Sequence, residues 1–406
     1  MNYSNLSYEL TKKITKETKK ENGIYFTPPD TIIKNIEILK RYLDKNSFID
    51  ILEPSCGSCE YINYIYKLYP DKNITGIEYN KDIYDTIKSI ENNNIKLVND
   101  SYLNFDINHN LKYDLIIGNP PYYVMNKKDI NQYYYQYFEG RPNIFILFII
   151  KSLLLLKKDG ILSFILPKNF INCLYYDKTR NYIYQNYKII DVVECNDNYI
   201  ETQQETILLI IQNNKININR NNNYVLIKNN YTIFSTKENI TKLKVLYDNS
   251  TTLSNLNFKV SVGNIVWNQC KDILTNDTSK TRLIYSSDIK NNKLLLTTYN
   301  NKDKKNYINK EGITEPLLVI NRGYGVGKYQ FNYCLIDINE KYLVENHLIC
   351  IKHIDNNIDK DELLKIYDKI IKSLKNDKTK QFIELYFGNN AMNTAELSYI
   401  LPIYDI

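Results

Sequence analysis

The first half of the chain alternates short apolar stretches with amphipathic ones, and no other feature restricts the fold as strongly. Such alternation favours a parallel sheet covered by helices on both faces. The last two apolar stretches follow each other without a helix, which predicts a closing antiparallel pair. The expected strands are 48–52, 74–78, 95–98, 114–118, 161–166, 189–194 and 206–211, and the expected helices are 59–69, 82–91, 144–157 and 177–186. We therefore expect an α/β fold with a Rossmann-like, doubly wound and mostly parallel sheet.

The pattern of apolar and polar residues changes after residue 212. Residues 213–230 are rich in Asn and Lys and lack clear periodicity, which is typical of a boundary between domains. Beyond them, short apolar runs are separated by polar turns and interrupted by an expected helix at 360–374. A length of 406 residues is enough for about two domains. We therefore predict a first domain at 1–230 and a mixed α/β second domain at 231–406.

Composition sets limits on the environment and the partners of the chain. Its net charge of +6 permits a polyanionic partner without requiring one. Seven irregularly spaced cysteines and a polar segment at 1–21 favour free thiols in a reducing, cytoplasmic compartment. The longest apolar run, 144–156, is too short to span a bilayer and is broken by Lys151 and Ser152. The excess of Asn, Lys, Ile and Tyr, whose codons are A/T-rich, indicates the AT-rich genome of a prokaryote or virus.

The segment with the most specific chemistry joins an apolar strand to a rigid turn. Residues 114–118 lead into Asn119-Pro120-Pro121-Tyr122, at the edge where open α/β sheets bind ligands. Two prolines fix φ and remove two backbone donors, so the Pro120 carbonyl is free to accept. That carbonyl and the Asn119 side-chain oxygen would hold the two N–H groups of an exocyclic amine and localise its lone pair for in-line attack on a sulfonium methyl. Tyr122 would stack on the ring, a contact worth about 1–3 kcal/mol.

Strand ends upstream carry groups expected for a nucleoside-containing cofactor. After the first strand, the small-residue turn 53–60 lets backbone approach a ligand beside a helix N-terminus. Glu78 ends the second strand, where an acidic residue can accept both ribose hydroxyls. Asp100 follows the third strand and is placed to accept from an adenine amino group. Each carboxylate alone is commonly a capping or surface residue, but their succession at strand ends favours the functional interpretation.

The order of these motifs resembles the gamma group of amino-methyltransferases, the TaqI-like Type II adenine-N6 DNA methyltransferases of restriction–modification systems. The likeness covers residues 22–212 and depends on the segments 25–29, 53–59, 76–78, 99–100 and 119–122. It implies a site-specific enzyme that transfers a methyl group from S-adenosyl-L-methionine to N6 of an adenine flipped out of double-stranded DNA. It further implies a C-terminal DNA target-recognition domain, with a cognate restriction endonuclease as a further partner.

Carried onto this sequence, the resemblance implies two groups of site residues. The cofactor is expected at Thr27, Pro28, Glu53, Pro54, Ser55, Gly57, Glu78, Tyr79, Asp100 and Asn119. Tyr199 is expected to stack on the far face of the flipped base, opposite Tyr122. Arg322 and Lys328 lie in a glycine-rich loop that would reach base edges or phosphates, and a mobile surface hairpin is the alternative.

One position departs from the family pattern. Cys59 stands where this turn usually ends in glycine, which puts ordinary cofactor affinity in question. The resulting Cys56–Cys59 spacing lacks the second cysteine pair or the histidines that a zinc site needs. We therefore expect neither a metal nor a membrane among the partners of this chain.

Two other functions fit part of the same sequence. Methyltransferases of ribosomal RNA or of a protein glutamine amide share Asn-Pro-Pro-Tyr or a close relative, but they usually lack a large domain after the sheet. A non-catalytic DNA-specificity module would explain the C-terminal half of the chain, but not the intact turn from Asn119 to Tyr122 or the acidic positions before it. A DNA methyltransferase is the expectation, and these two functions are the alternatives.

Overall fold

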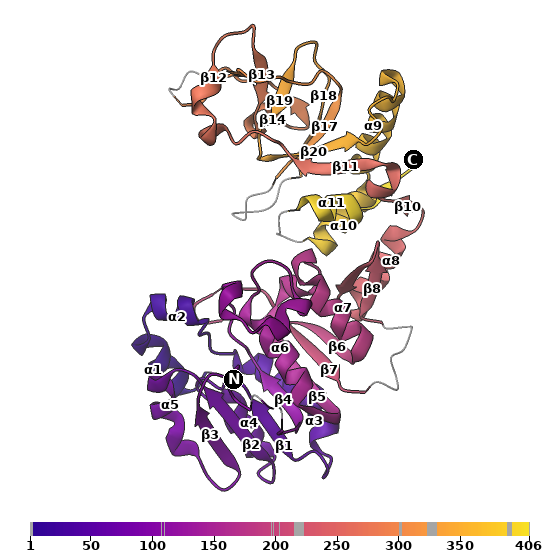
Figure 1. The fold of residues 1–406 in the computed structure, drawn as a ribbon. Coiled ribbons are helices and arrows are strands. Elements are labelled where there is room, and N and C mark those ends of the chain that lie inside the picture. Colours follow the sequence, from indigo (N-terminus) through magenta and orange to yellow (C-terminus); the bar gives the residue numbers. More distant parts are fainter. Residues whose placement is uncertain are drawn as a thin grey trace. The chain divides into compact units, whose positions relative to one another are not determined.

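In a computed structural model the chain forms two compact units, Met1–Ile240 and Thr241–Ile406 (Figure 1). The first unit carries all the motifs from 25–29 to 119–122 on which the resemblance depends. The residues that the structure describes are 3–106, 108, 110–195, 197, 199–202, 204–214, 223–299, 303–322, 331–387 and 392–405.

The first unit is built on a seven-stranded sheet in the order β3-β2-β1-β4-β5-β7-β6. Neighbouring strands from β3 to β5 are parallel, whereas β7 runs antiparallel to both β5 and β6. The strands are β1 (Asp50–Glu53), β2 (Asn73–Glu78), β3 (Ile95–Asn99), β4 (Tyr113–Gly118), β5 (Leu156–Pro167), β6 (Lys188–Cys195) and β7 (Thr206–Gln212). The expected doubly wound, mostly parallel sheet with a final antiparallel pair is confirmed.

Helices cover both faces of this sheet because successive strand residues point to opposite sides. In β4, Leu115 and Ile117 belong to one buried cluster and Ile116 belongs to another. The first cluster includes residues of α3 (Pro29–Leu43), α4 (Glu60–Leu68) and α5 (Lys81–Ile87), and the second includes residues of α6 (Ile144–Leu155) and α7 (Asp177–Asn186) (Figure 1). The strands are therefore buried on both faces, which explains their continuous apolar sequences.

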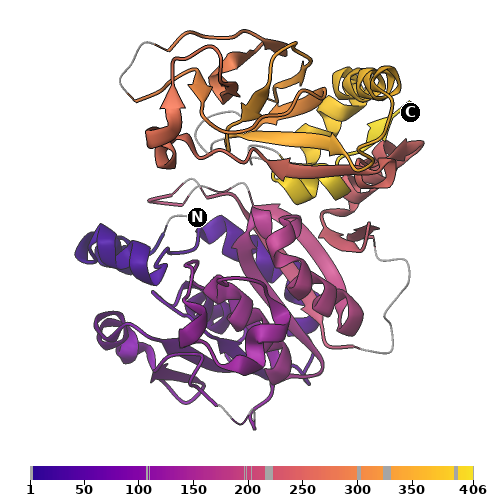
Figure 2. The ribbon, with the colours of Figure 1, turned by 45° about the horizontal axis from the view of Figure 1, so that its top comes forward.

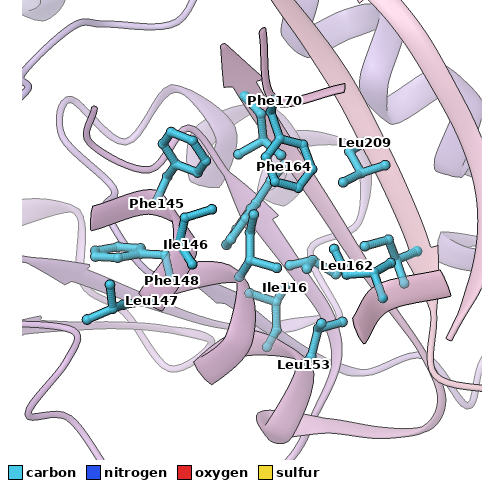
Figure 3. Close-up of a cluster of buried hydrophobic side chains, with 14 of the residues drawn as sticks. Ile116, Phe145, Ile146, Leu147, Phe148, Leu153, Leu162, Phe164, Phe170 and Leu209 are labelled. Carbon is cyan, nitrogen blue, oxygen red and sulfur yellow. The ribbon is translucent and has the colours of Figure 1, made fainter. Parts of the chain in front are cut away.

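Helix α6 is the central element of the second cluster. Eleven of its twelve residues are buried, as is usual for a helix that is apolar around its whole circumference. Figure 3 shows Phe145, Phe148 and Leu153 of this helix in one cluster with Ile116 and Leu162 of the sheet. The helix therefore has little freedom to shift relative to β4 and β5.

The end of α6 differs from the expectation. The sequence predicts a helix to residue 157, but α6 ends at Leu155 and β5 follows at once. Gly160 does not end the helix through a left-handed cap, because Asp159 rather than Gly160 has the left-handed backbone, with φ of 63°. Glycine is needed at 160 for a different reason, since a Cβ there would lie 2.9 Å from the Tyr113 carbonyl oxygen. The adjoining strand, and not a helix cap, dictates this turn.

The hairpin that follows the Asn-rich segment belongs to the first unit. Its strands, β8 (Val225–Lys228) and β9 (Tyr231–Phe234), pair with each other, and β9 lies against α7. The fully buried Arg180 guanidinium of α7 donates to the Thr232 carbonyl and to two further backbone carbonyls at 2.8 and 2.7 Å. These bonds explain why the two units divide at 240–241, later than the expected 230–231.

The second unit combines two four-stranded sheets with helices. The sheet orders are β11-β20-β17-β18 and β12-β16-β13-β19. Helix α9 lies beside the first sheet (Figure 2), where the Tyr367 hydroxyl donates to the Ile351 carbonyl of β20 at 2.8 Å. The helices of this half are α8 (Lys237–Tyr247), α9 (Lys360–Lys375), α10 (Asp377–Tyr386) and α11 (Thr394–Tyr399), and its strands are β10 (Ser250–Thr251), β11 (Phe258–Val262), β12 (Leu274–Thr275), β13 (Thr281–Ile284), β14 (Ile289–Lys290), β15 (Lys293–Leu294), β16 (Tyr307–Ile308), β17 (Leu317–Asn321), β18 (Tyr333–Ile336), β19 (Tyr342–Val344), β20 (Leu348–His353) and β21 (Ile403–Tyr404).

Replacing Arg180 should destabilise the first unit far more than replacing its neighbour on the same helix. Arg180→Met should lower the free energy of unfolding by about 3 kcal/mol or more, because three buried carbonyl oxygens lose their donor. Lys178→Met removes only an exposed ion pair with Glu139 and should cost less than about 1 kcal/mol. Urea unfolding followed by circular dichroism measures both, and equal losses would contradict this role for Arg180.

Candidate active site

A pocket of about 430 Å³ opens at the carboxyl end of the parallel strands. It lies where the sheet order reverses between β1 and β4, the point at which open α/β sheets bind their ligands. Its lining comes from the N-terminal segment, from the ends of β1 to β4 and from α6. The lining residues are Glu21, Asn22, Gly23, Ile24, Tyr25, Phe26, Pro54, Ser55, Gly57, Glu78, Tyr79, Asn80, Ile83, Asp100, Ser101, Tyr102, Leu103, Asn104, Asn119, Pro121, Tyr123, Met125, Ile144 and Phe148.

The turn between β1 and α4 contains two residues with left-handed backbone. Gly57 has φ of 50°, and its amide donates to the Glu78 carboxylate at 2.9 Å. Cys59, which immediately precedes α4, has φ of 60°, a conformation that costs an ordinary residue about 1–2 kcal/mol. The Cys59 side chain is fully buried in the first core cluster, and this packing offsets the strain. Cysteine therefore adopts here the backbone conformation that glycine adopts without penalty.

Glu78 ends β2 with both carboxylate oxygens already engaged. One oxygen accepts from the Gly57 amide at 2.9 Å and the other from the Asn80 amide at 2.7 Å. Burial raises the pKa of Glu78 to about 7, although these amide bonds act to lower it. A carboxylate has about four acceptor positions, so the ionised group can also accept from ligand hydroxyls.

An aromatic and apolar slot adjoins this carboxylate. Tyr79 is 69% exposed and lines the pocket beside Glu78, while Ile144 and Phe148 of α6 supply apolar surface. The exposed Asp100 follows β3, and its carboxylate accepts from the next backbone amide at 2.7 Å. A flat ring with an amino group and a sugar with two hydroxyls would find apolar walls and two carboxylates here. The adenosyl part of S-adenosylmethionine fits this set of groups.

Glu53, at the end of β1, is buried behind the pocket wall. Its side chain is 4% exposed, and Oε2 has no hydrogen-bond partner among the described residues. Burial raises the pKa of Glu53 well above its usual range, and Cys59, Glu60 and Glu78 act in the same direction. Gly118 adjoins this side chain, and a Cβ there would make an ordinary van der Waals contact with Glu53 Cγ at 3.5 Å. A ligand ammonium, such as that of S-adenosylmethionine, would supply the missing partner.

Asn119 follows β4 with both ends of its side-chain amide hydrogen-bonded. Nδ2 donates to the Tyr25 carbonyl at 3.3 Å, and Oδ1 accepts from the Tyr122 hydroxyl at 2.6 Å. The Tyr122 hydroxyl also lies 2.8 Å from the Ile165 carbonyl oxygen. These contacts fix which end of the amide is the acceptor, and one lone pair of Oδ1 remains for a substrate donor. No described residue donates to the neighbouring Pro120 carbonyl.

Some expected cofactor residues line the pocket and others lie behind it. Those at the wall are Pro54, Ser55, Gly57, Glu78, Tyr79, Asp100 and Asn119. Glu53 lies behind this wall. Thr27 and Pro28 are buried at the beginning of α3, and the two preceding residues, Tyr25 and Phe26, line the pocket in their place.

The two tyrosines expected to hold the flipped base both lie against Asn119. The ring of Tyr122 meets that of Phe145 edge-on, with centroids 5.9 Å apart. Tyr199 is 8% exposed; burial raises its pKa, while the side chains of Thr206 and Asn119 act to lower it. Tyr199 therefore has little exposed surface on which a base could stack.

The expected DNA contacts of the second unit are only partly described. Arg322 is exposed after β17, and its amide donates to the His347 carbonyl at 3.0 Å. Lys328 lies outside the described residues, and so do Gly388 to Asn390, which begin a segment (388–402) whose sequence resembles those of target-recognition domains. Within the described ranges, no group of His, Cys, Asp and Glu has the arrangement of a metal site. No helix in the same ranges combines the length and apolarity needed to cross a membrane.

The N-terminal helices contribute to the site without having been expected there. Helix α1 (Asn5–Lys13) precedes α2 (Lys16–Asn22), and the last two residues of α2 line the pocket together with Gly23 and Ile24. Gly23, with φ of 64°, lies so close to the turn 119–122 that a Cβ would lie 2.7 Å from the Tyr122 nitrogen. The sequence feature that could have indicated this contribution is Gly23, which lies between the polar segment 16–22 and the motif that begins at Tyr25.

Known proteins are similar to this chain both in its first unit and along its whole length. Residues 22–201 match the family described as Eco57I restriction-modification methylase. Over 99% of both chains the protein is 26% identical to the modification methylase CviBIII of Paramecium bursaria Chlorella virus NC1A, and over 94% of both it is 26% identical to the Type II methyltransferase M.CvrRI of Paramecium bursaria Chlorella virus XZ-6E. A DrdV–DNA complex solved by cryo-EM shares the fold over 98% of this chain and 57% of that one, with 13% identity and a TM-score of 0.55. From residue 22 to residue 201 the chain is therefore similar to the Eco57I restriction-modification methylases, and over nearly its full length it is similar to viral modification methylases.

Proposed function

We propose that this protein is a site-specific DNA methyltransferase that transfers a methyl group from S-adenosylmethionine to N6 of adenine. One observation carries the proposal: the Asn119 amide oxygen and the Pro120 carbonyl follow β4 at the edge of the pocket that contains Glu78 and Asp100. Similarity to modification methylases along the whole chain supports DNA as the substrate. Adenine as the base is supported by the resemblance of the turn 119–122 to the gamma group.

The residues of the pocket suffice to hold and orient the methyl donor. Bound S-adenosylmethionine supplies an electrophilic methyl group on a sulfonium. Glu78 would accept from its ribose hydroxyls and Asp100 from its adenine amino group, while Tyr79 and Phe148 of the pocket lining would supply apolar surface for the ring. The buried carboxyl of Glu53 would be the partner of the ammonium of the methionine part, and it would become ionised there because an adjacent cation lowers a carboxyl pKa.

Asn119 and Pro120 prepare the attacking nitrogen. Their two oxygens accept the two N6 hydrogens of the target adenine, which draws the lone pair out of the ring and directs it at the methyl carbon. The nitrogen–carbon bond forms as the carbon–sulfur bond breaks, and one N6 proton then leaves to solvent. Catalysis is mostly positioning, since the reacting atoms need only be held in line at near-contact distance.

Access to the base requires that adenine leave the duplex, at a cost of a few kcal/mol. We assign sequence recognition to the second unit, in which Arg322 is an exposed candidate for base or phosphate contact. Tyr122 and Tyr199 are the candidate partners of the extrahelical base because both adjoin Asn119. A cognate restriction endonuclease is an additional partner that the resemblance implies.

Asn119→Ala should reduce methyl transfer about a hundredfold or more, because a preorganised group that acts mainly in the transition state is lost. Binding of S-adenosylhomocysteine, measured by calorimetry, should persist. Tyr122→Phe is the matched variant, since it keeps the acceptor and loses only the hydroxyl that orients it, and it should cost about tenfold. Radiolabelled methyl incorporation into DNA measures both rates, and wild-type activity of Asn119→Ala would exclude the proposed role.

Cofactor affinity should fall as the pH is lowered through 7. Ribose hydroxyls donate most strongly to the ionised form of Glu78, whose pKa is about 7, because protonation removes the negative charge and weakens the acceptor. At pH 6 about one tenth of the group is ionised, and S-adenosylhomocysteine should bind about tenfold more weakly than at pH 8. Glu78→Gln should bind more weakly and should lose the part of this pH dependence that comes from Glu78, while the part that comes from ionisation of Glu53 remains. Calorimetry tests this, and equal wild-type affinities at pH 6 and 8 would refute it.

Expression in a bacterium without DNA methylation should produce N6-methyladenine at one short sequence motif. Long-read sequencing of the host genome maps both the modified base and the motif, with Asn119→Ala as the inactive control. Methylated cytosine in place of adenine would contradict the choice of base. Methyl incorporation into ribosomal RNA or a release factor, without incorporation into DNA, would favour the alternative methyltransferases.

A further inference from the structure

Helix α6 contains two polar residues that its burial does not explain. Lys151 and Ser152 interrupt an otherwise apolar sequence, and their side chains are 1% and 0% exposed. Burying an ammonium group costs several kcal/mol unless it is hydrogen-bonded or paired. Neither residue lines the pocket. Their partners therefore indicate what these two residues do.

Both side chains contact the loop that follows β3. The Lys151 ammonium donates to the Leu103 carbonyl at 3.1 Å and also to the Phe105 carbonyl. The Ser152 hydroxyl lies 2.8 Å from the Tyr102 hydroxyl. The same ammonium lies 5.2 Å from the centre of the Tyr102 ring, within the range of a cation–π contact. Two adjacent residues of α6 thus hold one loop at four points.

The other side of this loop forms part of the pocket. Ser101 to Asn104 are lining residues, and they directly follow Asp100, the expected acceptor for the adenine amino group. The loop's own backbone contributes the hydrogen bonds from the Asn104 and Phe105 amides to the Ser101 carbonyl. Its position relative to the sheet therefore depends largely on α6, which the surrounding core holds in place.

Charge supports the same arrangement. Burial lowers the pKa of Lys151 to about 8, while the carboxylates of Asp106 and Asp100 act to raise it. The ammonium therefore stays protonated at neutral pH, where its hydrogen bonds to carbonyls are charge-assisted and strong.

We propose that Lys151 and Ser152 are positioning residues that hold the cofactor-binding loop 101–105 against α6 and thereby set the affinity for the adenosyl group. The inference rests on the proposed function, because it takes S-adenosylmethionine as the ligand of this pocket. The two residues act through the loop and leave the acceptors at Asn119 and Pro120 unchanged. Their loss should therefore appear in cofactor binding and not in the chemical step.

Three variants test the inference in the full-length protein. Lys151→Met keeps the volume and removes the donor, and Tyr102→Phe removes only the hydroxyl bonded to Ser152. Lys157→Met is the control, since this lysine follows α6 closely in the sequence but pairs with Asp50 and Asp114 at the opposite edge of the sheet. The measurements are the KM for S-adenosylmethionine and kcat on unmethylated DNA, with the Kd for S-adenosylhomocysteine by calorimetry.

We expect Lys151→Met to raise KM and Kd about tenfold and Tyr102→Phe about threefold, with kcat at saturating cofactor within about twofold of wild type. Lys157→Met should lower the unfolding midpoint and leave both constants unchanged. Unchanged KM and Kd in folded Lys151→Met would overturn the inference. Should that variant fail to fold, unchanged constants in Tyr102→Phe would overturn it equally. Absence of cofactor binding by the wild-type protein would instead refute the proposed function.

Discussion

The hydrogen bond from the Asn119 amide to the Tyr25 carbonyl is the interaction on which the proposed chemistry of this site depends. An asparagine side chain has a donor end and an acceptor end of nearly equal shape, and only the acceptor end can hold an amine hydrogen. Tyr25 engages the donor end, and the Tyr122 hydroxyl confirms the opposite end as the acceptor. A rotated amide would place two N–H donors against the N–H donors of the substrate. The segment 25–29 and the turn 119–122 therefore form one unit in space although they are far apart in the sequence.

The strands of the sheet could be predicted from the sequence, but the exact ends of the elements around it could not. Apolar strands such as 114–118 are recognisable because both faces are buried, and their order follows from the alternation with helices. The predicted end of α6 was wrong because Gly160 is required by its close approach to the Tyr113 carbonyl on a neighbouring strand. The local sequence does not reveal that contact. Thr27 and Pro28 lie behind the pocket for a similar reason, since α3 begins there and carries them into the core.

The polar residues of α6 show a further limit of sequence analysis. Lys151 and Ser152 are visible in the sequence only as a break in an apolar run, which excludes a membrane span and says nothing more. Their partners lie in the loop 101–105, which precedes the helix by a strand and a long connection. The N-terminal contribution was equally hidden, because α2 is polar throughout and its single useful signal is Gly23. Residues that position a site through a second element carry no local motif.

The cofactor pocket and the place for the base differ in how completely they are formed. Glu78 is already fixed by two backbone amides, and the pocket beside it is open. Tyr199, in contrast, is almost fully buried, and the Asn119 oxygen already accepts a hydrogen bond from Tyr122. A small ligand gains affinity from such preorganisation, because it does not have to order the groups that bind it. Binding of the base requires that the buried ring of Tyr199 become exposed and that the base leave its stack in the duplex. The free energy for both steps would come from a large interface such as that with DNA. On the proposed function, methyl transfer is thereby coupled to DNA binding and not to binding of the cofactor alone.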